Sequence, residues 1–318
     1  MSVKEKKLAI VLPAYNEEPV IEKTTQILLA LLDKMVQEAL ISADSFIVYI
    51  DDGSKDKTWA LTQSLHAGDS RVKGIHFSRN FGHQNALIAG MTELTDTDVD
   101  YVVTIDADLQ DDPNSIVEMV KLANDGKDLV YGVRNDRTSD SWFKRFSAQS
   151  FYKVMNLLGV QTIPNHADFR LMDQKVLDVF KQYDERDMFL RGIFPSIGFK
   201  SAEVYYARAE REAGETKYPL RKMLKFATNG ITSFSVKPIT MIRNLGIAMF
   251  TVSVIFMIYV LCQYLSKNTT SGWPMLMISV WLIGGIQLMG IGVIGEYIGK
   301  IFMEVKHRPR YVIETKLK

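Results

Sequence analysis

The sequence contains a single cysteine, Cys262, among its 318 residues. One thiol cannot form an intramolecular disulfide, which excludes a disulfide-stapled fold. The chain also lacks a His/Cys cluster with zinc-binding spacing, and neither common nucleotide-binding glycine pattern, GxGxxG or GxxxxGK(S/T), occurs in it. The formal net charge is +1, so no overall excess of positive charge indicates a nucleic-acid partner.

Charge is almost absent from one region near the C-terminus. Between residues 244 and 295 the only charged residue is Lys267. Two uncharged runs, 245–265 and 274–295, are each long enough to cross a bilayer, which takes roughly 20 residues. The polar segment between them is short, so we expect a two-helix transmembrane hairpin. Two buried helices of a soluble core are the alternative, which the length of the runs and the uneven charge disfavour.

Positive charges flank both ends of this predicted hairpin, whereas its loop offers one lysine. The positive-inside rule then places both termini in the cytosol and the loop outside. The N-terminal apolar run is too short for a signal peptide, so the rest of the chain is expected to stay cytosolic. The flanking residues are Lys222, Lys225, Lys237 and Arg243 before the first run, and Lys300, Lys306, Arg308 and Arg310 after the second.

These features predict four parts of the chain. They are a cytosolic domain over 1–217, a juxtamembrane interfacial helix over 218–243, two transmembrane helices within 244–299, and a cytosolic tail over 300–318. Residues 141–158 form a further amphipathic candidate, either at the membrane surface or facing the core. The second membrane helix carries several glycines, which suit close helix packing in lipid and hint at a homo-oligomer formed through the hairpin.

The first half of the chain alternates between apolar runs and helical patterns. Strands are expected over 8–12, 46–50, 72–77, 100–105 and from 129 to 132, with helices over 19–40, 57–66, 84–94 and 113–124. This alternation predicts βαβ units, and continuous apolar strands suit a mostly parallel sheet covered on both faces by helices. The fold class is therefore α/β and Rossmann-like, with ligands bound beyond the carboxyl ends of the strands.

Polar segments follow each of these five strands, and a parallel sheet brings them to one edge. They read PAYNEE, DDGSKDKT, SRNFGHQNA, DADLQDD and GVRNDR. In the fourth, Asp106 and Asp108 can present carboxylates to Mg²⁺ or Mn²⁺ holding a diphosphate, and Gln110 can add an amide oxygen. Asp112 precedes a proline and a helix, which favours an N-cap. Asp111 is either solvated or part of the catalytic loop.

Other polar residues have two interpretations each. One carboxylate of Asp51 and Asp52 can accept hydrogen bonds from a nucleobase or ribose, although Asp-Asp-Gly-Ser is also a turn sequence. His83 is more often a structural hydrogen-bonding group than a catalyst. Four cationic residues are candidate phosphate-binding groups, although any one alone is more often a surface charge. They are Arg134, Arg145, Arg211 and Lys217.

The ordered motifs resemble those of family 2 glycosyltransferases with the GT-A fold. The motifs are VLPAYNE from Val11, DDGS from Asp51, RNFG from Arg79 and DADLQD from Asp106. The resemblance is closer to polyprenyl-phosphate glycosyltransferases, which include dolichol-phosphate mannose synthases and bacterial undecaprenyl-phosphate (bactoprenol) glucosyltransferases. REAGETKY from Arg211 is similar to their arginine-x-x-glycine-x-serine-lysine-tyrosine motif, with threonine in place of serine. The two-span C-terminal region fits the bacterial branch.

The resemblance implies a role for each matching position. Asp108 and Gln110, with Asp106, would hold the metal, Asp106 would contact the nucleotide side, and Asp168 would lie near the sugar. Catalytic roles would fall to Asp106, Asp108, Asp168, Arg211 and Lys217. Donor-binding roles would fall to Pro13, Tyr15, Glu17, Ile50, Asp52, Asp106, Ala107, Asp108, Arg134 and Arg145. The spacing around the arginine matched by Arg145 varies within the family, and Asp-Pro-Pro of the family is Asp111-Asp112-Pro113 here.

The activity that the resemblance implies is inverting transfer of one sugar to undecaprenyl phosphate at the cytosolic face of a bacterial cell membrane. Glucose from UDP-glucose is the first expectation, and GlcNAc, mannose from GDP-mannose and an aminoarabinose derivative are the alternatives. Processive relatives carry a glutamine-x-x-arginine-tryptophan motif, which is absent here, so a single transfer is expected. The alternative from another class is a non-catalytic, membrane-anchored subunit that binds a nucleotide sugar.

Overall fold

The computed structural model describes residues 5–135, 166–186, 188–207, 237–265 and 272–318. The chain divides into two compact units. The first comprises Met1–Lys153, Gln161–Tyr218 and Pro309–Lys318, and the second Val154–Val160 and Pro219–Arg308. The amphipathic candidate at 141–158 and most of the expected interfacial helix at 218–243 lie outside the described residues.

Eight described strands form one sheet in the first unit, in the order β7-β5-β6-β4-β1-β2-β3-β8. They are β1 (Leu8–Ala14), β2 (Phe46–Asp51), β3 (Val72–Phe77), β4 (Tyr101–Thr104), β5 (Leu129–Arg134), β6 (His166–Asp173), β7 (Ser201–Tyr206) and β8 (Ile313–Leu317). The first five confirm the expected strands to within a few residues. The pairs β1–β2, β1–β4, β2–β3 and β5–β7 are parallel, whereas β3–β8, β4–β6 and β5–β6 are antiparallel.

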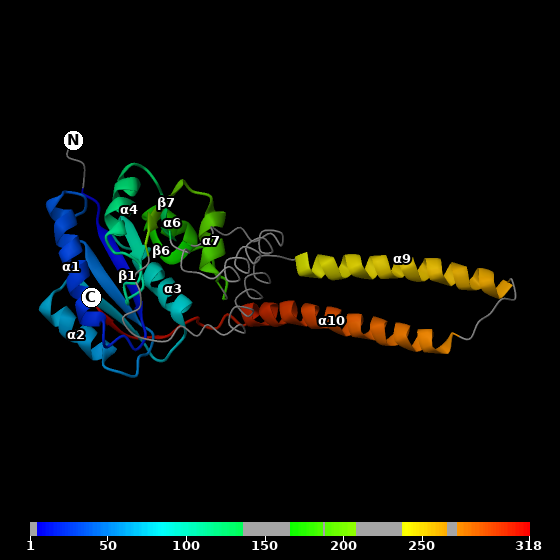
Figure 1. Ribbon diagram of the computed structural model, residues 1–318. Coiled ribbons are helices and arrows are strands. Elements are labelled where there is room, and N and C mark those ends of the chain that lie inside the picture. Colours follow the sequence, from blue (N-terminus) through cyan, green and yellow to red (C-terminus); the bar gives the residue numbers. More distant parts are fainter. Residues whose placement is uncertain (1–4, 136–165, 187, 208–236, 266–271) are drawn as a thin grey trace. The chain divides into compact units, whose positions relative to one another are not determined.

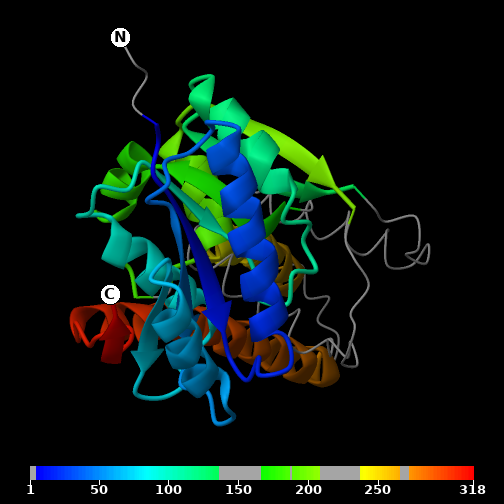
Figure 2. The same cartoon turned by 90° about the vertical axis from the view of Figure 1, so that its left-hand side faces the viewer.

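Helices cover both faces of this sheet (Figure 1). The expected helices are confirmed as α1 (Ile21–Gln37), α2 (Thr58–Gly68), α3 (His83–Leu94) and α4 (Ser115–Asn124), and α6 (Gln174–Phe180) and α7 (Leu190–Ile197) follow β6. In Figure 2, α1 lies across the face that is turned to the viewer. α3 packs on the other face, where a Cβ on Gly90 would lie 2.4 Å from Val11 and 3.1 Å from Ile50.

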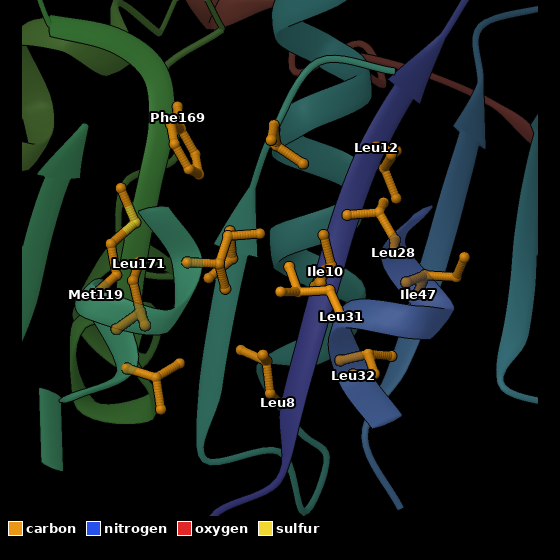
Figure 3. Packing of buried hydrophobic residues seen from close by; sticks show 14 of the residues in the cluster. Leu8, Ile10, Leu12, Leu28, Leu31, Leu32, Ile47, Met119, Phe169 and Leu171 are labelled. Atoms are coloured by element: carbon orange, nitrogen blue, oxygen red, sulfur yellow. The ribbon is translucent and has the colours of Figure 1, made fainter. Parts of the chain in front are cut away.

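The alternation of side chains along β1 explains this layering. Leu8, Ile10 and Leu12 point to one face and pack with Leu28 and Leu32 of α1 (Figure 3), and all five are fully buried. The intervening Val11 faces α3. A strand that is buried on both faces has no polar positions, which is why it reads as a continuous apolar run.

Two strands correct the expectation of a mostly parallel sheet. β6 runs antiparallel between β4 and β5, and its polar sequence HADFRLMD did not indicate a strand. β8 comes from the expected C-terminal tail, but Ile313–Leu317 pairs with β3 and belongs to the first unit. The sheet is therefore mixed. Because β6 is antiparallel, its first residues lie at the same edge as the carboxyl ends of β4 and β5.

The second unit contains two long helices, α9 (Lys237–Leu265) and α10 (Trp273–Val305). Within the described residues, one segment is long and apolar enough to cross a membrane, Ile283–Val305 in α10, and only 6% of its apolar stretch is buried. It begins nine residues after the start of the second apolar run expected from the sequence, 274–295, and overlaps the rest of that run. Residues 266–271 of the expected loop lie outside the described part of the chain.

Candidate active site

The loops after β1 and β2 are joined to one another by reciprocal hydrogen bonds. The backbone N–H groups of Asn16 and Glu17 donate to Ser54 Oγ and Thr58 Oγ1, both at 2.9 Å. In return, the Lys55 N–H donates to Asn16 Oδ1 at 2.8 Å. Because each loop supplies acceptors for the other, the two segments form one rigid wall at the carboxyl edge of the sheet.

Asp52 joins this wall to the loop after β3. Its carboxylate accepts the backbone N–H groups of Phe81 at 2.6 Å and Gly82 at 2.8 Å, just before α3 begins. Burial raises the pKa of Asp52, although these two N–H donors act in the opposite direction. Asp51 is fully buried and contacts His76 and Ser54. Both carboxylates thus have structural partners, which the sequence alone did not reveal.

Gly53 allows the β2 and β3 loops to approach this closely. It has a φ of +65°, and a Cβ at this position would lie 2.3 Å from the backbone carbon of Arg79. Only glycine tolerates both the left-handed conformation and the contact. The Asp-Asp-Gly-Ser turn is therefore required by the packing of the next loop.

The other expected donor-binding residues of this region differ in exposure. Tyr15 is 40% exposed and available to a ligand, whereas Ile50 is fully buried and packs against α3. Pro13 is buried beside Ile50 in the β1–β2 register, and Glu17 is half-buried. Ile50 and Pro13 therefore shape the floor of this edge, while Tyr15 presents a side chain to solvent.

The loop after β4 carries the paired carboxylates. Gln110 Nε2 donates to Asp108 Oδ2 at 2.7 Å, and Thr24 of α1 holds the loop through the Ala107 carbonyl at 2.7 Å. The Asp106 side chain is 41% exposed. Desolvation by the surrounding protein nevertheless raises the pKa of Asp106 to about 6, with His83 opposing the shift and the carboxylates of Asp168, Asp111 and Asp108 adding to it.

This donor set fits a divalent metal that takes its other ligands from a substrate. Within the described residues, no three His, Cys, Asp or Glu side chains are grouped so as to hold a metal by themselves. Mg²⁺ is commonly held by one or two carboxylates together with substrate phosphates, which matches Asp106 and Asp108. Gln110 directs its amide nitrogen to Asp108 and so orients that carboxylate, and metal binding by its amide oxygen stays a prediction.

Asp168 lies opposite Asp106, at the beginning of β6. It pairs with Arg170 Nη2 at 2.6 Å and with Arg191 Nη2 at 3.2 Å. Burial alone would raise the pKa of Asp168, but Arg191 and Arg170, helped by His83, hold it well below its usual range. Asp168 is therefore ionised at neutral pH, and it is a poor proton acceptor.

His83, the first residue of α3, lies between these two carboxylates. Its Nε2 is 3.6 Å from Asp106 Oδ1 and 3.9 Å from Asp168 Oδ2, and its side chain is 47% exposed. The sequence favoured a structural role for this histidine and gave no sign of Arg170 or Arg191. Arg170 is only 1% exposed. The sequence pattern that could have indicated it is an aspartate and an arginine two residues apart, which point to the same face of a strand and can pair there.

The remaining acidic residues of the loop are now assigned. Arg134, at the end of β5, pairs with Asp111 through Nε at 3.0 Å and Nη2 at 2.9 Å, and Asp111 is only 1% exposed. The Asp112 carboxylate accepts the Asn114 N–H at 3.0 Å, so it closes a turn before α4. Asp112 thus makes the capping hydrogen bond that was expected, although α4 itself begins at Ser115 and its N-cap position is Asn114. Arg145, Arg211 and Lys217 lie outside the described residues.

Comparison with known proteins shows the family to which the chain belongs. The model of glycosyl transferase family 2 matches residues 9–180, which include every strand-end loop described above. The chain belongs to glycosyltransferase family 2. It is a glycosyltransferase, and the matched residues run from β1 to the end of α6.

Relatives of nearly full length support this membership. The chain is 50% identical over 310 residues to the uncharacterized glycosyltransferase YkoT of Bacillus subtilis, covering 98% of this chain and 92% of the relative. It is 38% identical over 313 residues to a prophage bactoprenol glucosyl transferase homolog of Escherichia coli, covering 97% and 98%. The bactoprenol glucosyl transferase of Shigella phage SfV is also 38% identical, over 314 residues and with the same shares.

Similarity to solved structures is more distant. Glucosyl-3-phosphoglycerate synthase of Mycobacterium tuberculosis, solved with Mn²⁺, UDP-glucose and phosphoglyceric acid, shares 19% identity with a TM-score of 0.42. The match covers 71% of this chain and 78% of that one. These ligands are those of the mycobacterial enzyme.

Proposed function

We propose that this enzyme transfers one glucose from UDP-glucose to undecaprenyl phosphate, with inversion, at the cytosolic face of a bacterial membrane. The observation that carries the proposal is the match, over 97% of the chain, to relatives named bactoprenol glucosyl transferase. Three features of the carboxyl edge support it, namely the loop that carries Asp106 and Asp108, the neighbouring wall, and the two arginines beside Asp168, of which Arg170 is buried.

The donor would bind across the wall formed by the β1 and β2 loops and the Asp106–Asp108 loop. Tyr15 and Glu17 would contact the nucleotide, above the floor made by Pro13 and Ile50. Asp106 and Asp108 would hold Mg²⁺ or Mn²⁺, which would neutralise charge that builds on the leaving diphosphate.

The cationic residues expected around the phosphates complete the proposed site. Arg211, Lys217 and Arg145 would contact the donor diphosphate and the acceptor phosphate, which repel one another without them. Arg134 would act differently from a free phosphate-binding group, because it already pairs with Asp111. Its contribution would be to fix the end of β5 beside the carboxylate loop.

No strong general base is needed for this reaction. The acceptor phosphate is ionised near neutral pH, so its oxygen can attack the anomeric carbon directly while the nucleoside diphosphate leaves from the opposite face. Asp168 fits a positioning role, because its arginine partners hold its pKa well below the usual range. Its carboxylate would orient the sugar, and His83 would lie between it and Asp106.

The membrane part of the proposal is a two-span hairpin with both termini in the cytosol. Apolar residues such as Leu288, Met289 and Ile291 of α10 are 64–72% exposed, which suits a lipid-facing helix. The arrangement would keep the site near lipid headgroups, where the acceptor phosphate lies. Self-association through the glycine-bearing α10 belongs to the same proposal. A cysteine placed at Asn268, in a Cys262→Ala background, tests the two-span topology. An impermeant maleimide should label that position from outside intact cells.

Release of nucleoside diphosphate from a panel of nucleotide sugars tests the reaction. Purified full-length protein with Mn²⁺ should release UDP from UDP-glucose only when undecaprenyl phosphate is present. Preference for UDP-GlcNAc, GDP-mannose or an aminoarabinose donor would correct the sugar. Binding of a nucleotide sugar without release from any donor would overturn the enzymatic proposal in favour of a binding subunit.

A further inference from the structure

The segment that follows α10 is built into the sheet beside the proposed donor site. β8 pairs with β3 from Gly74 to Phe77, and the ring of Tyr311 stacks on Phe77 with centroids 5.2 Å apart. Lys316 pairs with Glu93 of α3 at 2.5 Å. All of these residues belong to the first unit, so this C-terminal strand is part of the catalytic domain.

His76 of β3 is the residue that this strand encloses. Its imidazole stacks on Trp59 of α2 with ring centroids 4.8 Å apart, and its side chain is 18% exposed. Thr315 of β8 is its partner in the strand register, and Glu314 Oε2 lies 3.8 Å from its Nε2. The ring is therefore held on both sides, which fixes the direction of its Nδ1.

His76 Nδ1 lies 2.5 Å from Asp51 Oδ2, and Asp51 is fully buried. An ionised carboxylate only accepts hydrogen bonds, so Nδ1 is the donor in this pair. The other carboxylate oxygen, Oδ1, accepts both the Ser54 hydroxyl and the Ser54 backbone N–H. A buried carboxylate needs such partners, because an unpaired buried charge is costly.

The chain of hydrogen bonds ends on the loop after β1. Ser54 Oγ, which donates to Asp51, accepts the backbone N–H of Asn16 at 2.9 Å. Asn16 has a φ of +57° and lies between Tyr15 and Glu17, the two residues proposed to contact the nucleotide. Four groups in sequence, His76, Asp51, Ser54 and the Asn16 N–H, thus connect the β3–β8 edge to the donor loop.

We propose that His76 is a positioning residue for donor binding, which acts through Asp51 and Ser54 on the Asn16 loop. The inference rests on the proposed function for the identity of the ligand, a nucleoside diphosphate. Loss of the Nδ1 donor would leave the Asp51 carboxylate short of a partner and free to turn away from Ser54. The Asn16 N–H would then lose its acceptor, and the loop would bind the nucleotide less tightly.

Two substitutions separate the hydrogen bond from the packing of the ring. His76→Phe keeps a ring to stack on Trp59 but removes the donor. His76→Asn loses the ring but places an amide nitrogen on Cγ, where histidine carries Nδ1. The matched control is Lys316→Ala, which removes an ion pair of β8 without contacting His76.

The measurements are UDP binding by calorimetry and backbone hydrogen exchange, both on full-length protein in detergent. His76→Phe should bind UDP about tenfold more weakly, the usual effect of losing a hydrogen bond to a charged group, and should exchange faster over residues 15–18. His76→Asn and Lys316→Ala should resemble the wild type in both.

Each result decides one question. Slow exchange of the 15–18 amides in His76→Phe would overturn the positioning role. Weaker UDP binding in His76→Asn with wild-type binding in His76→Phe would also overturn it, because that result would indicate ring packing alone. If wild-type protein does not bind UDP, the proposed donor is wrong. Hydrogen exchange still decides the role of His76 in that case, because it requires no nucleotide.

Discussion

The two halves of the carboxyl edge satisfy their carboxylates in different ways. On the β1–β2–β3 side, Asp52 accepts backbone N–H groups and Asp51 bonds to a histidine and a serine. On the β4–β6–β5 side, Asp168 and Asp111 pair with arginines, and Asp106 lies among other acidic groups. The first half is a wall fixed by hydrogen bonds to backbone, whereas the second is a balanced set of full charges.

This difference indicates that the two halves have different roles, one in fixing loop geometry and the other in electrostatics. Hydrogen bonds to backbone N–H groups fix the geometry of the loops, and they partly balance the carboxylate charge that a substrate would meet. Paired and crowded ions, by contrast, create a field that a phosphate or a metal can alter. Substitutions in the charged half should therefore change the chemistry, or expose buried charge, while substitutions in the wall should change loop geometry.

The largest effect is expected from Asp108→Ala. Loss of a metal-binding carboxylate should lower kcat on the order of a thousandfold, because a bound metal supplies several kcal/mol of transition-state stabilisation. The measurement is undecaprenyl-phosphate-dependent UDP release across a Mn²⁺ titration. Asp112→Ala is the control in the same loop and should keep most of its activity. Near-normal turnover of Asp108→Ala would show that the charged half does not hold the metal there.

The next largest effect is expected from Asp168→Asn, measured as stability. The free energy of unfolding should fall by about 3–5 kcal/mol at neutral pH, because Arg170 is left buried without its charged partner. Chemical denaturation of the full-length protein in detergent measures this. Asp96→Asn, which breaks the exposed pair with Lys181, is the control and should change stability little.

The pH dependence of that difference follows from the depressed pKa of Asp168. Burial opposes the shift, but Arg191 and Arg170 keep the folded pKa below the unfolded value of about 3.9. The stabilisation is therefore fully present above the unfolded pKa and lost only as the pH falls through the folded pKa. The wild-type and Asp168→Asn stabilities should differ by a constant amount above about pH 5. A difference that shrinks between neutral pH and that point would contradict the ion-pair assignment.

The sequence predicted strands that are buried along their whole length better than strands that carry polar residues. β1, β2 and β4 are buried on both faces and read as unbroken apolar runs, so their positions were predicted. β6 was missed because Asp168 and Arg170 neutralise one another, and such mutual compensation cannot be seen in a polarity pattern. β8 was missed because an edge strand such as IETKL needs few apolar residues.

In the site, local patterns were predicted and partners that are distant in the sequence were not. Asp106 and Asp108 were predicted because a pair of carboxylates after a strand is a local pattern. The partner of Arg134 was not predicted, since Asp111 lies 23 residues away in the sequence and only the fold brings them together. Likewise, the contact of Asp51 with His76, 25 residues away, was not predicted.

A geometric test of the wall is Gly53→Ala. The left-handed φ costs about 1–3 kcal/mol for a side-chain-bearing residue, and the contact with the Arg79 backbone adds overpacking of about 1–3 kcal/mol. Gly126→Ala is the matched control, since its φ is +89° and no atom lies within 4 Å of its Cβ position. Denaturation should show a larger loss for Gly53→Ala. Equal losses would mean that the two loops are free to separate.

The smallest effect is expected from Asp52→Asn, which changes one atom of the wall. Asparagine offers one acceptor oxygen where two N–H groups need acceptors, so stability should fall by about 1–3 kcal/mol. Hydrogen exchange should become faster at Phe81 or Gly82, and kcat should change less than in Asp108→Ala. If instead turnover is abolished while both amides stay protected, Asp52 contacts the substrate directly. The wall would then take part in recognition through its charge, and the two halves of the edge would differ less than their hydrogen bonds indicate.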